Sequence, residues 1–141
     1  MTSYDPKTAP NIFPGLRYAD APAAIEWLRR AFGFEVHMVV PGEGNTIAHA
    51  ELRLGAGMIM LGSMKDDAHV LLSPKQAGGC TQSIYLVVDD VDALHDRAKR
   101  AGAEIFFGLR DTEYGSRDFG CRDPEGHVWN FGTYSPYAEA K

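Results

Sequence analysis

The two halves of the chain repeat one order of features at a constant spacing. In the first half, an apolar segment ends at Asp20, a helical stretch follows it, and Gly33 ends that stretch. In the second half, an apolar segment ends at Asp89, a helical stretch follows it, and Gly102 ends that stretch. The step is 69 positions both from 20 to 89 and from 33 to 102. A shared step across a strand end and a helix stop predicts one structural unit used twice.

Two stretches, residues 21–32 and 90–101, carry apolar side chains at the spacing of one face of an α-helix. Asp20 is a suitable N-cap, because its carboxylate can accept a hydrogen bond from a free N–H of the first turn. Gly33 and Gly102 follow the last apolar positions, and glycine ends helices because it adopts left-handed backbone angles at little steric cost. Both stretches are therefore predicted to be amphipathic helices.

The remaining apolar segments alternate as β-strands do. We predict strands at residues 35–40, 46–54, 58–62, 82–88, 104–107, 116–122 and 127–133. A Gly-Ala-Gly turn joins the second of these to the third, and an Asp-Pro-Glu-Gly turn joins the last two. The pattern predicts an α+β fold of tandem βαβββ units, about residues 11–63 and 81–134. We expect a mixed, curved sheet around a shared cleft, within one domain spanning residues 1–141.

Strand alternation divides the side chains into two faces. The convex face, which the helices are expected to cover, carries Leu52, Leu54, Ile59, Leu61, Ile84, Leu86, Val88, Trp129 and Phe131. The concave face carries Phe13, His49, Glu51, Arg53, Met58, Met60, Ser83, Tyr85, Val87, Val128 and Asn130. This mixture of aromatic, polar and methionine side chains is typical of a ligand-binding surface.

Composition excludes several classes of protein. The net charge of −5 argues against nucleic acid as a partner, since phosphate binding needs a basic face. The two cysteines, Cys80 and Cys121, form no Cys-x-x-Cys pair, which excludes a zinc ribbon and favours a reduced cytoplasm. No apolar run approaches the roughly 20 residues of a membrane span. We therefore expect a cytoplasmic protein with a small-molecule partner.

One long segment identifies a family. Residues 114–131 read Tyr-Gly-Ser-Arg-Asp-Phe-Gly-Cys-Arg-Asp-Pro-Glu-Gly-His-Val-Trp-Asn-Phe, and residues 31–34 read Ala-Phe-Gly-Phe. With two βαβββ units, these segments resemble the glyoxalase/bleomycin-resistance/dioxygenase (vicinal oxygen chelate) superfamily over about residues 11–134. The Tyr-Gly-Ser-Arg opening is similar to the bleomycin-resistance-like branch. The resemblance implies a concave binding cleft and a homodimer.

The same resemblance implies where a divalent metal would be held. The metal-dependent members use His or Gln, Glu, His and Glu at positions that correspond here to Phe13, Met60, Ser83 and Asn130. None of these four is a good ligand for a hard divalent ion. Shifting the correspondence by one residue does not introduce a His, Asp or Glu. We therefore expect no metal and no other cofactor, which argues against glyoxalase I, epimerase and extradiol dioxygenase activity.

Other residues allow more than one interpretation. His49 and Glu51 share one face of a strand, so they could form an acid–base pair, a relocated metal site, or a polar pair hydrogen-bonded to its neighbours. Arg117 could bind a ligand carboxylate or form salt bridges with protein carboxylates. Phe119 could line the cleft or lie in the core, because the face of its strand is not fixed by the sequence.

The leading hypothesis is that the protein binds a small organic molecule. Its role would be to sequester a drug or a metabolite, as in antibiotic resistance. The alternative is a metal-independent enzyme, lyase-like or isomerase-like, in the same cleft, with His49, Glu51 and Tyr85 as its catalytic candidates. The expected ligand-binding residues are Phe13, His49, Glu51, Met60, Ser83, Tyr85, Arg117, Phe119 and Asn130. If the two faces are assigned correctly, replacing Tyr85 or Glu51 should impair binding, whereas replacing Leu86 or Trp129 should destabilise the fold.

Overall fold

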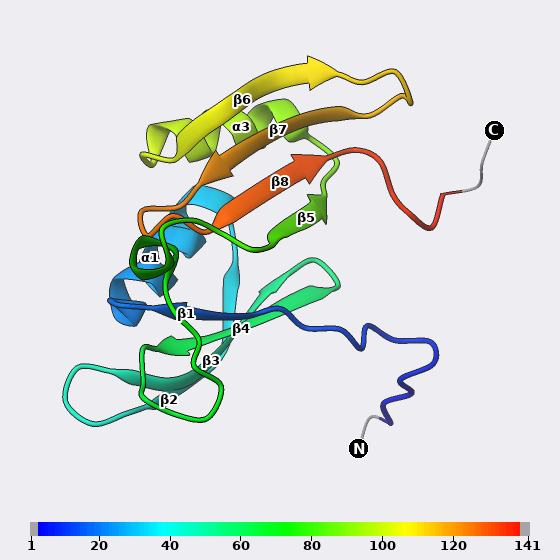
Figure 1. The fold of residues 1–141 in the computed structure, drawn as a ribbon. Coiled ribbons are helices and arrows are strands. Elements are labelled where there is room, and N and C mark those ends of the chain that lie inside the picture. The colour runs from blue at the N-terminus through cyan, green and yellow to red at the C-terminus, as the bar shows by residue number, and fades with distance from the viewer. Residues whose placement is uncertain (1–2, 139–141) are drawn as a thin grey trace. The chain divides into compact units, whose positions relative to one another are not determined.

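A computed structural model describes residues 3–138 of the chain (Figure 1). These residues form two compact units. The first unit comprises residues up to 29 together with 33–71, and the second comprises residues 30–32 and those from 72 onward. Each unit contains one four-stranded sheet. Within the described residues, no helix is both long and apolar enough to cross a membrane.

The first unit is built on a mixed sheet with the strand order β1-β4-β3-β2. Strand β1 runs parallel to β4, and the other neighbours are antiparallel. The elements along the chain are β1 (Gly15–Tyr18), α1 (Ala21–Phe32), β2 (Glu35–Pro41), β3 (Ile47–Leu54) and β4 (Gly57–Ser63). This is the predicted strand–helix–three-strand unit.

The second unit repeats that topology with the strand order β5-β8-β7-β6, in which β5 runs parallel to β8. Its elements are α2 (Pro74–Ala77), β5 (Ser83–Val87), α3 (Val91–Arg100), β6 (Glu104–Asp111), β7 (Arg117–Arg122) and β8 (Val128–Gly132). Two sheets with the same strand order confirm the predicted α+β fold of tandem βαβββ units.

The N-caps of the two long helices correct the predicted repeat by one residue. The Asp20 carboxylate accepts a hydrogen bond from the Ala23 amide at 3.1 Å, and the Asp90 carboxylate accepts one from the Ala93 amide at 3.0 Å. Asp20 therefore corresponds to Asp90 rather than to Asp89. Two adjacent aspartates satisfy the same sequence pattern, so only the cap geometry identifies the equivalent one.

The predicted strands and helices agree with the structure to within one residue at each end, except for β6, and one short helix was not predicted. Strand β6 continues to Asp111, beyond the predicted end at residue 107, across two irregularities in its pairing with β7. Helix α2 lies in a segment where no helix was predicted. It is stabilised by a capping box, in which the Ser73 hydroxyl accepts from the Gln76 amide and the Gln76 side chain accepts from the Ser73 amide.

Burial follows the predicted alternation. Leu52, Ile59, Leu61, Trp129 and Phe131 are buried, whereas Ile84 and Leu86 are half-buried. In the second unit, the Phe32 ring lies 5.2 Å from that of Trp129 and 4.8 Å from that of Phe131. Trp129 and Phe131 on β8 therefore face the core, and the residues that alternate with them face the opposite side of the sheet.

Candidate functional site

Strand register gathers the polar residues of the second unit on one face of its sheet. Tyr85 is the Cα partner of Asn130, and Asn130 is in turn the partner of Gly120. Ser83 lies two residues before Tyr85 and is exposed. Directly paired residues point to the same side of a sheet, and so do residues two apart on one strand. Ser83, Tyr85 and Asn130 therefore share the face opposite Trp129, as the alternation predicts.

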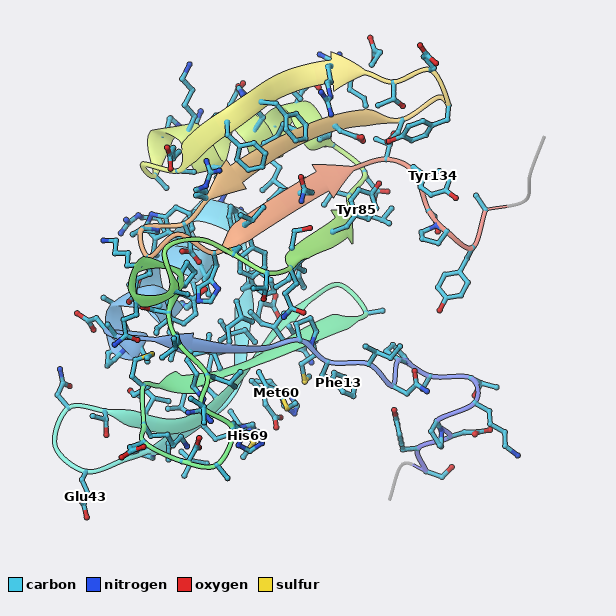
Figure 2. All side chains as sticks on the ribbon, viewed as in Figure 1. Phe13, Glu43, Met60, His69, Tyr85 and Tyr134 are labelled. Atoms are coloured by element: carbon cyan, nitrogen blue, oxygen red, sulfur yellow. The ribbon has the colours of Figure 1, made fainter. Side chains whose placement is uncertain are left out.

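A pocket of about 490 Å³ opens on this unit, lined by Tyr85, Tyr114, Tyr134 and Pro136. We call it the tyrosine pocket. Tyr85 comes from β5, Tyr114 from the connection between β6 and β7, and Tyr134 from the segment after β8. Figure 2 labels Tyr85 and Tyr134, which the chain brings from separate segments to the same end of the sheet. The Tyr114 and Tyr134 rings are nearly perpendicular, at 83°, with centroids 5.7 Å apart.

A hydrogen-bond network underlies the tyrosine pocket. The Tyr85 hydroxyl donates to the Tyr134 carbonyl at 2.6 Å, and the Tyr114 hydroxyl donates to Asp118 Oδ2 at 3.2 Å. The Ser116 hydroxyl donates to Asp118 Oδ1 and accepts from the Tyr134 amide at 3.1 Å. Asp118 is only 8% exposed. The network fixes all three tyrosines relative to one buried carboxylate.

Gly132 allows this network to form. A Cβ atom at position 132 would lie 2.6 Å from the Tyr85 hydroxyl oxygen and would also overlap Asp118 Oδ1. Gly132 is the Cα partner of Asp118 and of Val87, so the space above it is where side chains from β5 and β7 meet. A residue without a side chain is needed here because two polar groups occupy the volume of its Cβ.

Burial raises the pKa of the Tyr85 hydroxyl above its ordinary value of 10.0. The negative charge of Asp118 and the neighbouring Tyr114 raise the pKa further, and hydrogen bonds with Ser116 and Tyr134 oppose the change. The direction means that Tyr85 stays neutral at physiological pH. It therefore acts as a hydrogen-bond donor rather than as a phenolate base.

The polar candidates of the first unit gather around Glu51 on β3. His49 Nε2 lies 2.8 Å from Glu51 Oε2, and His37 Nε2 lies 3.9 Å from Glu51 Oε1. Met60 is the Cα partner of Glu51 on β4, so their side chains share a face. Phe13 immediately precedes the segment that enters β1, with 36% of its surface exposed.

Two predicted ligand-binding residues have other roles in the structure. Phe119 is fully buried and stacks on Phe131, with ring centroids 5.1 Å apart. Its Cα partner is Phe131, so the register places it in the core rather than on the polar face. Arg117 Nε lies 2.7 Å from Asp92 Oδ1, and its Nη1 lies 3.3 Å from Asp111 Oδ1, which is the salt-bridge alternative.

Several residues of this unit were not predicted from the sequence. Tyr114 and Tyr134 line the tyrosine pocket but lie outside strands and share no periodicity. Asp118 on β7 belongs to the hydrogen-bond network beneath the pocket. Phe106 and Phe107 approach Gly120, and the Arg122 guanidinium lies 4.7 Å from the centre of the Phe106 ring. The Tyr-Gly-Ser-Arg-Asp run at 114–118 is the one signal that could have identified Tyr114 and Asp118, as part of the motif segment.

A βαβββ unit used twice, with a polar open face on its sheet, defines the class of protein. The model of the glyoxalase/bleomycin resistance protein/dioxygenase superfamily matches residues 12–131, and the chain therefore belongs to this superfamily. A Mycobacterium bovis protein named Uncharacterized protein Mb0911c is 35% identical over 128 residues, which are 87% of this chain and 82% of that protein. Uncharacterized protein Rv0887c of Mycobacterium tuberculosis is also 35% identical, over 74% of its length.

Solved structures agree with this assignment. TioX from Micromonospora sp. ML1 is 36% identical, with a TM-score of 0.73 over 90% of this chain and 100% of that chain. The fosfomycin resistance protein FosX from Listeria monocytogenes has a TM-score of 0.67 at 14% identity, over 91% of this chain and 95% of that chain. At that identity, the likeness to FosX concerns the fold alone.

The residues at the superfamily's metal positions do not fit a divalent ion. Phe13 offers no donor atom, Met60 offers a thioether, and Ser83 and Asn130 offer uncharged oxygens. Among residues 3–138, no group of three or more His, Cys, Asp or Glu side chains is arranged to hold a metal.

Proposed function

We propose that this protein binds a small organic molecule on the open sheet face of its second unit, without a divalent metal. The observation that carries the proposal is the tyrosine pocket of about 490 Å³, whose size suits a small ligand. Aromatic side chains around a few fixed polar groups are the usual composition of such sites. Drug or metabolite sequestration is the role that we propose for this pocket.

The tyrosine pocket is suited to binding more than to catalysis. The Tyr85 and Tyr114 hydroxyls are both engaged with protein acceptors, and the pKa of Tyr85 is raised. A neutral, hydrogen-bonded phenol is a poor base at neutral pH. The rings are nevertheless partly exposed and present their faces for stacking. The pocket therefore offers contact area and orientation for a ligand rather than a proton acceptor.

The proposal is tested by screening small aromatic compounds against the full chain, before and after chelator treatment, by calorimetry and amide NMR. We expect binding that survives chelation and shifts the amide signals around Tyr134. Tyr134→Ala should weaken binding by roughly tenfold, the usual scale for loss of an aromatic contact. Tyr137→Ala is the matched control, since Tyr137 is 98% exposed and lies outside the pocket. A stoichiometric metal whose removal abolishes binding would contradict the proposal.

A second candidate function is supported by the His49–Glu51 contact. An imidazole 2.8 Å from a carboxylate is the arrangement of an oriented general base, which a metal-independent enzyme would need. His49→Gln should then abolish turnover of any compound found to react, while leaving binding at the tyrosine pocket unchanged. Equal turnover by H49Q and the original chain would exclude this candidate.

A further inference from the structure

We propose that the tyrosine pocket is a site for an organic cation, a quaternary ammonium or a protonated amine. Its rings would contact the cation, and the Asp118 carboxylate would supply the opposing charge. The inference rests on the proposed small-molecule binding and adds the chemical class of the ligand. It follows from the ring geometry, the state of Asp118 and the direction in which the hydroxyl groups donate.

The rings form an open corner of aromatic surface. Tyr114 and Tyr134 meet at 83°, and they are 67% and 44% exposed. Tyr85, at 39% exposed, forms a third side. The face of an aromatic ring carries negative charge density, so several rings around one volume attract a cation. Perpendicular rings wall an open corner rather than a flat slot, which suits a compact ammonium group better than a flat ring system.

Asp118 is a buried carboxylate whose recorded partners are uncharged. It accepts from the Ser116 and Tyr114 hydroxyls, and no Lys, Arg or His in residues 3–138 forms a salt bridge with it. Buried charges are usually paired, because removing an ion from water is costly. The nearest arginine along the chain, Arg117, is engaged by Asp92 and Asp111. A bound cation would therefore supply the countercharge that the protein does not.

The hydroxyl groups point away from a role in anion binding. Tyr85 donates to the Tyr134 carbonyl and Tyr114 donates to Asp118, so both phenolic protons are already used inside the network. The Tyr134 hydroxyl lies outside this network and is the one phenolic donor of the three that can turn to a ligand. An anion would be repelled by Asp118, whereas a cation is attracted both by that carboxylate and by the ring faces. The net charge of −5 further favours the approach of a cation.

The experiment compares choline with its uncharged isostere 3,3-dimethylbutan-1-ol, using amide NMR titration of the full chain. The two compounds match in shape, so the difference between their dissociation constants reports the charge. We expect choline to bind roughly tenfold more tightly, as befits a desolvated cation–π contact with a nearby carboxylate. The shifted amides should include that of Tyr134, whose carbonyl borders the pocket.

Two variants separate the contribution of the Asp118 carboxylate from that of the aromatic rings. Asp118→Asn keeps the shape of the side chain and should remove most of the preference for choline, leaving the affinity for the isostere unchanged. Tyr134→Leu keeps an apolar wall without a π-face and should also lower the affinity for choline; this residue is exposed enough that the fold does not depend on its ring. Asp89→Asn is the control, because it removes one exposed carboxylate outside the pocket.

Each outcome bears on a different statement. Equal affinities for choline and the isostere, or no binding of either at millimolar concentration, would overturn the organic-cation inference. The proposal that the pocket binds small molecules would still hold if uncharged compounds from the screen shifted the amide signals of the pocket. Compounds that bind without shifting these amides would overturn both. A loss of choline binding in D89N equal to that in D118N would show general charge attraction and would also overturn the inference.

Discussion

Cys121 lies in the core of the second unit, beside Trp129 in the sheet, and its burial changes its acid–base behaviour. The side chain is fully buried on β7. Burial, with a smaller contribution from the nearby Asp123 charge, raises the pKa of the thiol from 9.0 to about 12. A neutral thiol is therefore strongly preferred in the folded chain, and the thiolate forms more readily on unfolding.

This shift predicts a loss of stability in alkaline solution. Above pH 9.0 the unfolded thiol releases its proton while the folded one keeps it until about pH 12, so the unfolded state gains stability. The free energy of unfolding should fall by up to about 1.4 kcal/mol per pH unit in this interval. Urea unfolding of the original chain and of Cys121→Ala at several pH values measures the difference. Parallel curves for the two proteins would contradict the prediction.

Single side chains were predictable where strand alternation determines their direction. Tyr85 is exposed and Leu86 is half-buried, as period-2 spacing requires. Phe119 was not predictable in this way, because its face depends on the pairing of β7 with β8, which places it beside Phe131. Register between strands is a tertiary property, so a strand of mixed polarity such as β7 leaves both faces open.

Helix ends give a second prediction, at the scale of elements. Asp90 caps α3 through its 3.0 Å hydrogen bond with the Ala93 amide, whereas Asp89 is exposed and precedes the cap. Asp90→Ala should lower the free energy of unfolding by about 1 kcal/mol, and Asp89→Ala by a few tenths at most. Thermal or urea unfolding of the two variants makes the comparison. A larger loss of stability in Asp89→Ala than in Asp90→Ala would make Asp89 the cap and would restore the 69-residue spacing of the two caps.

Elements with strong local signals were predicted well, and those held by distant contacts were not. Helix α1 has the predicted bounds because Asp20 and Gly33 mark its two ends locally. Strand β6 extends to Asp111 because β7 supplies hydrogen-bond partners that far. Helix α2 is a single turn fixed by the Ser73–Gln76 capping box, and four residues are too few to show helical periodicity.

At the scale of the whole chain, the internal repeat was sufficient to predict the tandem fold, whereas the pocket was not predictable. A repeat predicts that the same succession of strands and helix occurs twice along the chain, and each unit must then bury its own apolar face. The tyrosine pocket instead depends on Tyr114 and Tyr134, which lie in connections whose path is set by contacts such as the Ser116–Tyr134 hydrogen bond. Such contacts join residues distant in sequence and leave no local pattern.

Strand β2 forms one edge of the first sheet and supports the prediction of a homodimer. All seven of its residues are exposed, including four apolar ones, Val36, Met38, Val39 and Val40, each about 40% exposed. One side of β2 pairs with β3, and the other has no neighbour in the sheet order. An exposed apolar edge favours pairing with another chain, and a two-fold axis would cover the same edge on both copies.

The dimer is tested by light scattering coupled to size exclusion at micromolar concentration. We expect a mass of twice the 15.5 kDa of one chain. Val39→Lys should shift that mass toward the monomer, because lysine on an edge strand opposes pairing by charge repulsion and by the cost of burying an ammonium group. Ile12→Lys is the matched control, since Ile12 is 86% exposed and lies outside β2.

A monomeric mass for the original chain would refute the dimer. A dimer unaffected by V39K would place the interface elsewhere, because two buried lysines cannot be accommodated at a shared apolar edge without weakening it.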